Sequence, residues 1–344
     1  MERDLNVILQ TIFQNSRDIA KNLNQANAQL AIFLEAINLA IHLNPDSPVI
    51  AEASHVLSRF LAEKETNIRY LSLEAMAKIV SSATDATGIK DNEDAILAML
   101  KDRDISVRRA AIDVLYNMCD QNNAKSIVTE LLQYLNVADY GIREDLVLKI
   151  AIMAERYATD LSWYVDVILQ LISVAGDHVG EDVWYRVVQM IVNNQSLQEY
   201  ASQSCLQYLR STVCHEKAVN VGGYILGEYG HLIANDPNCA PLDQLTALHS
   251  KFGTSSHATK ALLLTTYFKF ANLFPEIKTQ IQSVFEQLTG SLDIELQQRA
   301  CEYLAMMQMP TDDLIQTVCD EMPMFPDRSQ LLISCLQKKG TLTA

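Results

Sequence analysis

Glycine and proline are scarce in this sequence of 344 residues, which contains 11 glycines and 8 prolines. All-β folds need many turns rich in these two residues, so their scarcity counts against such a fold. Long stretches are instead rich in Leu, Ala, Gln, Glu and Ile. With 49% hydrophobic and 20% charged residues the chain has the balance of a folded protein. The composition predicts a nearly all-helical protein.

Positive charge and long apolar runs are also in short supply. The chain has 27 Lys and Arg against 42 Asp and Glu, a net charge of −15. This excess of acid argues against nucleic acid or an anionic lipid surface as the main partner. The first ten residues carry charges where a signal peptide needs an apolar core, and no run reaches about 18 uninterrupted apolar residues. We therefore expect a soluble intracellular protein with no nucleic-acid partner.

Catalytic and metal-binding motifs are missing as well. The sequence has no phosphate-binding loop, nucleophile elbow, zinc-protease, calcium-loop or dinucleotide-glycine motif. Its cysteines are odd in number and form no CxxC pair, and most lie in apolar helical runs, as in a cytosolic protein. They are Cys119, Cys205, Cys214, Cys239, Cys301, Cys319 and Cys335. A zinc site from Cys205, Cys214, His215 and Cys239 would ignore the usual ligand spacing. We expect no enzyme, no cofactor, and no catalytic, cofactor or metal residue.

Two clusters have both a structural and a functional interpretation. Four glycines in 222–230 could cradle a phosphate, but the residues between them keep helical phase, which favours close helix packing. Trp163 and Trp184, with their neighbours Tyr164 and Tyr185, could form an interaction hot spot. Packing in the core between repeats is the favoured interpretation.

An internal repeat of about 40 residues runs through the chain. Similar segments begin at anchor residues separated by 39, 35, 43 and 111 positions, and the last gap is three times 37. These anchors are Glu65, Asp104, Asp139, Asp182 and Asp293. Two further copies are expected inside the long gap, one at Ser256 and one near 219–223, and another lies at 27–38. The sequence thus predicts about eight units.

Each unit carries the apolar pattern of a helix and is preceded by a second such segment. Apolar residues recur after Asp104 at i, i+4, i+7, i+8 and i+11, between Val107 and Met118. The apolar positions of 127–135 form the second segment ahead of Asp139. Two antiparallel helices in about 40 residues are typical of HEAT and armadillo units. We predict an all-α fold, an α-α superhelix of about eight helical hairpins.

Acidic residues and arginines recur at fixed places in these units. Each acid lies where a helix N-cap or first turn is expected, and the arginine follows four residues later on the same face. The residues are Asp104, Asp139 and Asp182, with Arg108, Arg143 and Arg186. Each arginine could pair with its own acid or with that of the next repeat. Partly buried ladders and solvated surface pairs remain equally open interpretations.

No linker rich in Gly, Ser or Pro divides the repeats, so we expect one continuous solenoid over 27–309. Residues 1–26 form a helical segment before it. Pro310, Pro323 and Pro326 interrupt the helical pattern, so 310–344 is expected to be the end of the trunk running into a linker.

Several segments resemble the alpha-adaptins, the large alpha subunits of the plasma-membrane clathrin adaptor complex. The similarity runs from about Asn27 to Gly340, and VWYRV followed by VGGYILGE is its most specific part. The segments are WYVDVILQLI (163–172), GEDVWYRVVQMIVN (180–193), VGGYILGEYG (221–230), NLFPEIK (272–278) and ELQQRACEYL (295–304). Tyr229 stands where the family pattern has Phe, which adds a hydroxyl that needs a hydrogen bond.

This resemblance implies a non-catalytic scaffold in endocytosis and intracellular protein transport. It implies a trunk whose concave face docks the small (sigma), medium (mu) and beta-adaptin subunits and supports vesicle coat assembly. The location implied is cytoplasmic, peripheral at the plasma membrane and clathrin-coated pits. The chain resembles the middle and C-terminal part of the trunk, so membrane contact is expected through parts of the family protein outside it. No binding residue is assigned.

The repeat period alone would also permit a regulatory or transport solenoid, such as a phosphatase scaffold or a karyopherin-like carrier. An acidic solenoid would suit basic cargo. The adaptin-like motifs favour the adaptor.

Overall fold

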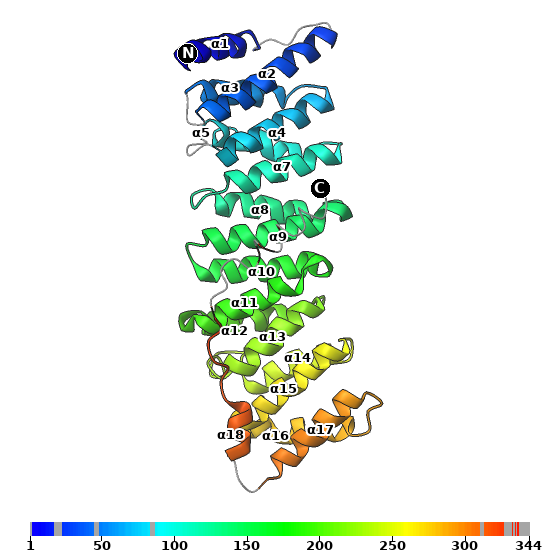
Figure 1. The fold of residues 1–344 in the computed structure, drawn as a ribbon. Helices are drawn as coiled ribbons and strands as arrows, with labels where there is room; N and C mark the ends of the chain where they lie inside the picture. The colour runs from blue at the N-terminus through cyan, green and yellow to red at the C-terminus, as the bar shows by residue number, and fades with distance from the viewer. Residues whose placement is uncertain are drawn as a thin grey trace. The chain divides into compact units, whose positions relative to one another are not determined.

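The computed structural model describes residues 2–16, 23–44, 48–82, 87–309 and 313–326, together with 332, 334 and 336. Of these residues 79% are helical and none lies in a β-strand. The prediction of an all-α fold is confirmed. The chain divides into two compact units, Met1–Ile142 and Arg143–Ala344, and α9 (Tyr140–Tyr157) begins in the first and continues in the second (Figure 1).

The remaining helices of the first unit run from residue 2 to residue 135. They are α1 (Glu2–Asn15), α2 (Leu23–Leu43), α3 (Pro48–Phe60), α4 (Thr66–Ser82), α5 (Thr87–Lys90), α6 (Glu93–Ala98), the 3-10 turn η1 (Met99–Lys101), α7 (Ile105–Met118) and α8 (Ala124–Leu135).

The second unit continues with nine more α-helices and two short 3-10 turns in its described residues. They are α10 (Leu161–Ala175), η2 (Gly176–His178), α11 (Glu181–Asn193), α12 (Gln195–Leu209), α13 (Glu216–Tyr229), α14 (Pro241–Phe252), α15 (His257–Leu273), η3 (Pro275–Ile277), α16 (Lys278–Leu288), α17 (Ile294–Met307) and α18 (Asp313–Cys319).

Helices begin where the repeat predicts them. Five of them start one residue after a predicted anchor, namely α4, α7, α9, α15 and α17. Helix α11 starts at Glu181, so Asp182 lies in its first turn. The copy expected near 219–223 lies in α13, and the copy at 27–38 lies in α2. We call these eight the anchor helices: α2, α4, α7, α9, α11, α13, α15 and α17. The prediction of about eight helical repeats is confirmed.

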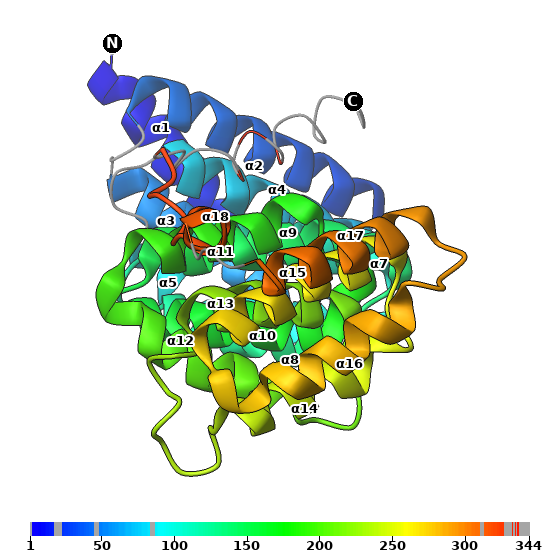
Figure 2. The same cartoon turned by 90° about the horizontal axis from the view of Figure 1, so that it is seen from below.

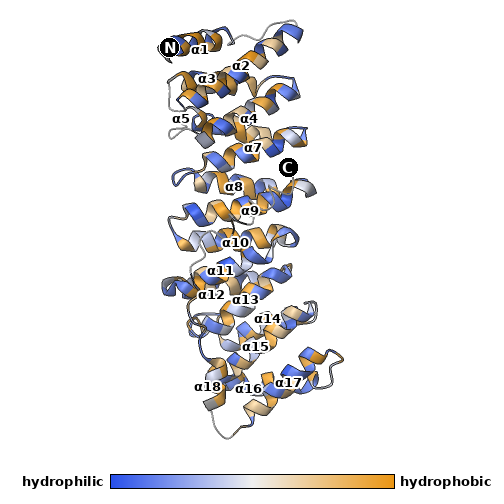
Figure 3. Cartoon of the chain, viewed as in Figure 1, coloured by the Kyte–Doolittle hydropathy of each residue, from blue (hydrophilic) through white to orange (hydrophobic). Residues whose placement is uncertain are grey.

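Within each unit the helices form layers. In the first unit α4 packs against α7, and in the second α13 packs against α15 and α15 against α17. The helices before the anchor helices pack in the same way, as α10 does against α12 and α12 against α14. The end-on view shows α11, α15 and α17 in one layer of the second unit and α12, α14 and α16 in the other (Figure 2). The helices carry both apolar and polar residues (Figure 3), as such layered packing requires.

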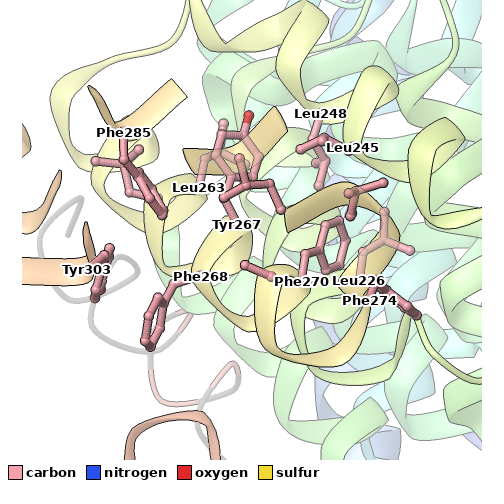
Figure 4. Close-up of a cluster of buried hydrophobic side chains, with 14 of the residues drawn as sticks. Leu226, Leu245, Leu248, Leu263, Tyr267, Phe268, Phe270, Phe274, Phe285 and Tyr303 are labelled. Carbon is pink, nitrogen blue, oxygen red and sulfur yellow. The ribbon is translucent and has the colours of Figure 1, made fainter. Parts of the chain in front are cut away.

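Aromatic side chains join the last repeats of the second unit. The rings of Phe268 and Tyr303 stack with centroids 4.6 Å apart, and the Phe285 ring lies 5.6 Å from that of Tyr303 (Figure 4). Fully burying a large apolar side chain contributes about 1.5–3 kcal/mol. These contacts tie α15, α16 and α17 into one core.

The glycines of α13 let the neighbouring helices approach. A Cβ atom on Gly222 would lie 2.7 Å from Leu209 of α12, and one on Gly223 would lie 2.9 Å from both Leu262 and Leu263 of α15. Thr266 Oγ1 donates a hydrogen bond of 2.8 Å to the carbonyl of Gly223. Close helix packing, the favoured interpretation of this cluster, is confirmed.

Helix α2 is long and apolar enough to cross a membrane, judged by the length and composition of Asn24–Leu43 (mean hydropathy 1.3). In the structure it packs against α1, α3 and α4. Phe33 is fully buried, with its ring 5.3 Å from that of Phe13 and 5.4 Å from that of Phe60. One face of α2 thus packs into the stack, and 33% of the Asn24–Leu43 window is buried.

The C-terminal part of the chain contains a helix that the proline pattern did not predict. Helix α17 ends at Met307, and the seven residues of α18 follow before an extended segment at 320–326. Such a short helix leaves little periodic signal between prolines. Pro310 lies outside the described residues. The division of the chain at residues 26 and 309 stays a prediction.

Candidate interaction surface

Charged side chains link several anchor helices to a neighbouring repeat. Arg108 of α7 pairs with Asp139, the anchor acid of the next repeat, 31 positions away. Arg186 of α11 pairs instead with Glu155 of α9, and its Nε and Nη2 lie 2.9 and 2.7 Å from Glu155 Oε1. The ladder between repeats is thus present, and Arg186 uses an acid of the preceding anchor helix for it.

The exposure of these side chains decides for each pair whether it is a partly buried link or a solvated surface pair. The side chains of Arg186 and Glu155 are 6% and 14% exposed, whereas that of Asp139 is 46% exposed. The Arg186 pair is therefore part of the interior, and the Arg108 pair lies at the surface edge.

Arg69 of α4 makes a similar link that the repeat alignment did not predict. Its Nε lies 2.7 Å from Oδ2 of Asp102, a buried carboxylate in the next repeat. Burial raises the pKa of Asp102, but hydrogen bonds from the Asp104 N–H and from Arg69 outweigh it and hold the pKa below its ordinary value.

Acidic residues also cap the anchor helices, as predicted for Asp104. Its Oδ1 accepts a hydrogen bond of 2.7 Å from the backbone N–H of Ser106. Asp293 does the same for Glu295 at 3.0 Å. Where the repeat lacks an acid, Ser256 and His215 cap α15 and α13. These caps satisfy N–H groups that have no partner inside the helix.

His215 and Cys205, two of the residues that a zinc site would need, have structural roles in the repeats. His215 accepts from the backbone N–H of Lys217 through Nδ1 and contacts Asp177 through Nε2 at 3.0 Å. Burial raises the pKa of the Cys205 thiol to about 12. Among the described residues no group of three or more His, Cys, Asp or Glu side chains is placed to hold a metal ion.

The aromatic cluster belongs mainly to the core. Tyr164 is fully buried and Trp184 nearly so, whereas Tyr185 is half exposed with its ring 4.0 Å from that of Trp184. Core packing, the favoured interpretation, is confirmed for Tyr164 and Trp184.

An extended segment lies across three anchor helices of the second unit. We call residues 320–326, with the sequence DEMPMFP, the strap. In Figure 1 the red trace after α18 leads toward α11. There Asn193 Nδ2 donates to the carbonyl of Phe325 at 3.0 Å, and Asn193 Oδ1 accepts from the N–H of Phe325 at 2.9 Å. One side chain thus satisfies both backbone groups of a residue 132 positions away.

A buried ion pair holds the other end of the strap. Lys269 of α15 bonds to Oε1 of Glu228 of α13, and both side chains are at most 10% exposed. Glu228 Oε2 accepts from the N–H of Met322 at 3.4 Å, and Lys269 Nζ donates to the carbonyl of Asp320 at 3.3 Å. Both members of the pair therefore contact the backbone of the strap.

A hollow of about 470 Å³ remains under the first residues of the strap. Its walls come from α13, α15, α18 and the strap, and include Tyr224, Glu228, Thr266, Lys269 and Met322. The hydroxyl oxygen of Tyr224 is buried and makes no hydrogen bond within the described chain. Burial raises the pKa of Tyr224 well above its ordinary value.

Tyr229, the departure from the adaptin pattern, is also buried in α13. Its hydroxyl makes no hydrogen bond of normal geometry to any described residue, so the partner expected for it is not found there. Burial, and then the negative charges of Glu321 and Glu228, raise its pKa to about 12.

Asn193, Glu228 and Lys269 were not predicted from the sequence as binding residues. A signal was present for two of them, because Glu228 and Lys269 are opposite charges inside apolar helical runs and lie 41 residues, one repeat, apart. Asn193 is a polar residue at the end of its helix and carried no comparable signal.

Stacked helical hairpins joined by ion pairs between repeats define an α-solenoid repeat protein. Residues 5–311 match the family model described as the adaptin N terminal region. The chain belongs to the adaptin family. Its placement in the middle and C-terminal part of the trunk is corrected by this match to the N-terminal trunk region. That placement rested on the adaptin segments that the chain resembles, because similar repeats do not by themselves reveal their position along a stack.

Three relatives illustrate the similarity, and the chain spans about a third of their length. It is 52% identical over 325 residues to AP-2 complex subunit alpha-2 of Dictyostelium discoideum, covering 94% of this chain and 33% of the relative. It is 44% identical to AP-2 complex subunit alpha-1 of Arabidopsis thaliana, covering 95% and 32%. It is also 44% identical to AP-2 complex subunit alpha of Schizosaccharomyces pombe, covering 89% and 35%.

Among solved structures, a chain in a homology model of the full-length AP-3 complex in an intermediate open conformation is similar with a TM-score of 0.57. The match covers 92% of this chain and 61% of that one at 18% identity. It shows that the two chains share a fold.

Proposed function

We propose that this chain is a non-catalytic scaffold segment of the alpha large subunit of the AP-2 clathrin adaptor. The observation that carries the proposal is the identity of 44–52% to AP-2 alpha subunits over 89–95% of the chain. The most specific adaptin-like segments, VWYRV and VGGYILGE, lie in α11 and α13. These two helices also carry Asn193 and Glu228.

The scaffold acts by holding the exposed surfaces of successive repeats in a fixed register. Buried pairs such as Arg186–Glu155 and Glu228–Lys269 join helices of neighbouring repeats. Breaking such a pair leaves an unpaired buried charge, which strongly disfavours any slip between the repeats. A stack held in this way presents its exposed side chains at constant spacing to the other subunits.

One such surface lies between α4 and α7 of the first unit. A groove of about 270 Å³ is lined by Tyr70, Ile105 and Arg109, among others, and Tyr70 and Ile105 are 37% and 43% exposed. Aromatic and arginine side chains are enriched at protein interfaces. We assign this groove to contact with another subunit of the same adaptor.

The partners in this proposal are the small (sigma), medium (mu) and beta-adaptin subunits. The chain supports coat assembly in the cytoplasm, peripherally at the plasma membrane and clathrin-coated pits. The net charge of −15 supports membrane contact through other parts of the adaptor.

Co-expression tests the proposal. The chain and the sigma, mu and beta subunits of AP-2 are expected to elute together from a size-exclusion column. An Ile105→Asp variant should weaken this association, whereas Lys78→Ala on the exposed side of α4 should not. A folded chain that binds none of the three subunits would contradict the proposal, and binding to basic peptides or a GTPase instead would favour a carrier.

A further inference from the structure

We propose that Asn193, Glu228 and Lys269 form a binding track for the backbone of an extended peptide. The strap occupies this track as an exchangeable ligand within the chain. The external occupant is an extended segment of another protein, with a long side chain that ends in a hydrogen-bond acceptor. This inference does not depend on the adaptor role.

The spacing of the contacts fits an extended peptide that crosses successive repeats. The strap touches α15 at residue 320, α13 at 322 and α11 at 325, so it runs opposite to the order of the repeats. Five extended residues span about 17 Å at roughly 3.3 Å each. Two steps between packed helices span about 16–20 Å. One peptide can therefore keep contact with each anchor helix in turn.

The track recognises backbone rather than side chains. Asn193 uses its amide to pair with both the N–H and the carbonyl of Phe325, as a neighbouring β-strand would. Glu228 and Lys269 likewise contact a backbone N–H and a carbonyl. Because none of these contacts uses a strap side chain, another extended peptide can make the same ones.

The track does not need the strap to keep its shape. Glu228 and Lys269 lie on helices α13 and α15 and are paired with each other, and both are almost fully buried with the strap in place. Asn193 lies at the end of α11, whose buried residues pack into the core of the unit. The recognising groups are therefore supported by contacts that remain when the strap leaves.

The strap itself is a poor fit to this wall. Phe325 is partly buried, but Met324 is 75% exposed and Met322 is 45% exposed, so the two methionines bury little apolar surface. The hollow beneath residues 320–323 is unfilled by the strap, and the hydroxyl of Tyr224 has no hydrogen-bond partner there. A peptide with a longer side chain at the position of Met322, ending in an acceptor for Tyr224, would fill this space and compete with the strap.

A labelled peptide tests the track. The probe is fluorescein-DEMPMFP, and its anisotropy is measured with the full chain and with a full-length variant whose residues 320–326 are replaced by a Gly-Ser segment of equal length. The replaced variant is expected to bind the probe at least about tenfold more tightly, because no strap competes. Asn193→Ala in that variant should weaken binding about tenfold, the ratio expected when one or two hydrogen bonds are lost.

Two controls separate backbone recognition from other effects. A probe methylated on the nitrogen of its Phe should bind as weakly as the unmodified probe binds to Asn193→Ala, because the donor to Asn193 is gone. Asn194→Ala removes a neighbouring amide that contacts α11 itself and not the strap, and should leave binding unchanged. Asn193→Asp keeps the acceptor for the N–H of Phe325 but loses the donor to its carbonyl. This variant is used in place of Asn193→Ala if circular dichroism shows that the alanine variant does not fold.

Hydrogen exchange on the unaltered chain gives an independent result. The N–H of Phe325 should exchange slowly, and excess unlabelled peptide should speed its exchange by displacing the strap. Equal probe binding by the full chain and the strap-replaced variant would overturn the proposal. So would binding that is insensitive to both substitutions at Asn193.

Discussion

Replacing Arg186 by Met should strongly destabilise the second unit. The guanidinium donates two hydrogen bonds to Glu155 Oε1, and only 5% of Arg186 is exposed. Met has a similar length but no charge, so the carboxylate of Glu155 would stay buried without its partner. Breaking a buried pair from one side costs about 3–5 kcal/mol. We expect a loss of about 3 kcal/mol in the free energy of unfolding, at the low end because Glu155 is 14% exposed and can reach some water.

The double variant Arg186→Met, Glu155→Leu separates the pair from simple loss of packing. It removes both charges and should recover most of the stability, to within about 1 kcal/mol of the unaltered chain, because apolar replacement of a buried pair is often neutral. Lys78→Met is the matched control, since Lys78 pairs with Glu74 four residues away on the surface of α4. It should cost less than about 0.5 kcal/mol.

The two tryptophans of the chain report on this region. Trp163 lies in α10 and Trp184 in α11, two residues before Arg186. Urea titrations followed by tryptophan fluorescence and by far-ultraviolet circular dichroism therefore show local and global unfolding separately. A single variant that costs less than about 1 kcal/mol, or a double variant as unstable as the single one, would refute the reasoning.

Three further results are expected. Gly223→Val should lower the free energy of unfolding by about 1–3 kcal/mol because its Cβ has no room beside α15, whereas Gly253→Ala, with open space around it, should be neutral; thermal melts measure both. Because the pKa of Asp102 is lowered in the folded chain, its stabilisation is present above about pH 3.9 and is lost as the pH falls below it. In urea titrations between pH 2 and pH 6, the free energy of unfolding that is lost on acidification should be smaller for Arg69→Met than for the unaltered chain. With its net charge of −15, the chain alone should bind little to phosphoinositide vesicles in co-sedimentation at physiological salt.

The repeat architecture could be predicted from the sequence because the same signals recur in each unit. An acid at the helix start, such as Asp104 or Asp293, caps the helix whatever lies around it, so its position marks the helix boundary directly. The apolar phase of each segment then identifies which face meets the core. These are local effects, and repetition turns weak local evidence into a strong pattern.

Contacts between distant parts of the chain could not be predicted in this way. The alignment suggested that each arginine uses an anchor acid, as Arg108 does, but it did not predict that Arg186 pairs with Glu155 at the far end of the preceding anchor helix. The bond between Asn193 and Phe325 joins residues 132 positions apart and depends on the path of the chain after α18. No periodic pattern encodes that path.

The buried charges of Glu228 and Lys269 illustrate how one pair can serve two purposes in a repeat stack. A stack of similar hairpins has few features that forbid a slip between neighbours, because apolar surfaces pack in several ways. Two opposite charges one repeat apart meet in only one register, and every other register leaves both buried and unpaired. Such a pair still has free lone pairs and protons, and here they point to the backbone of the strap. The pair that sets the register is therefore also held in place to bind the backbone of an extended segment.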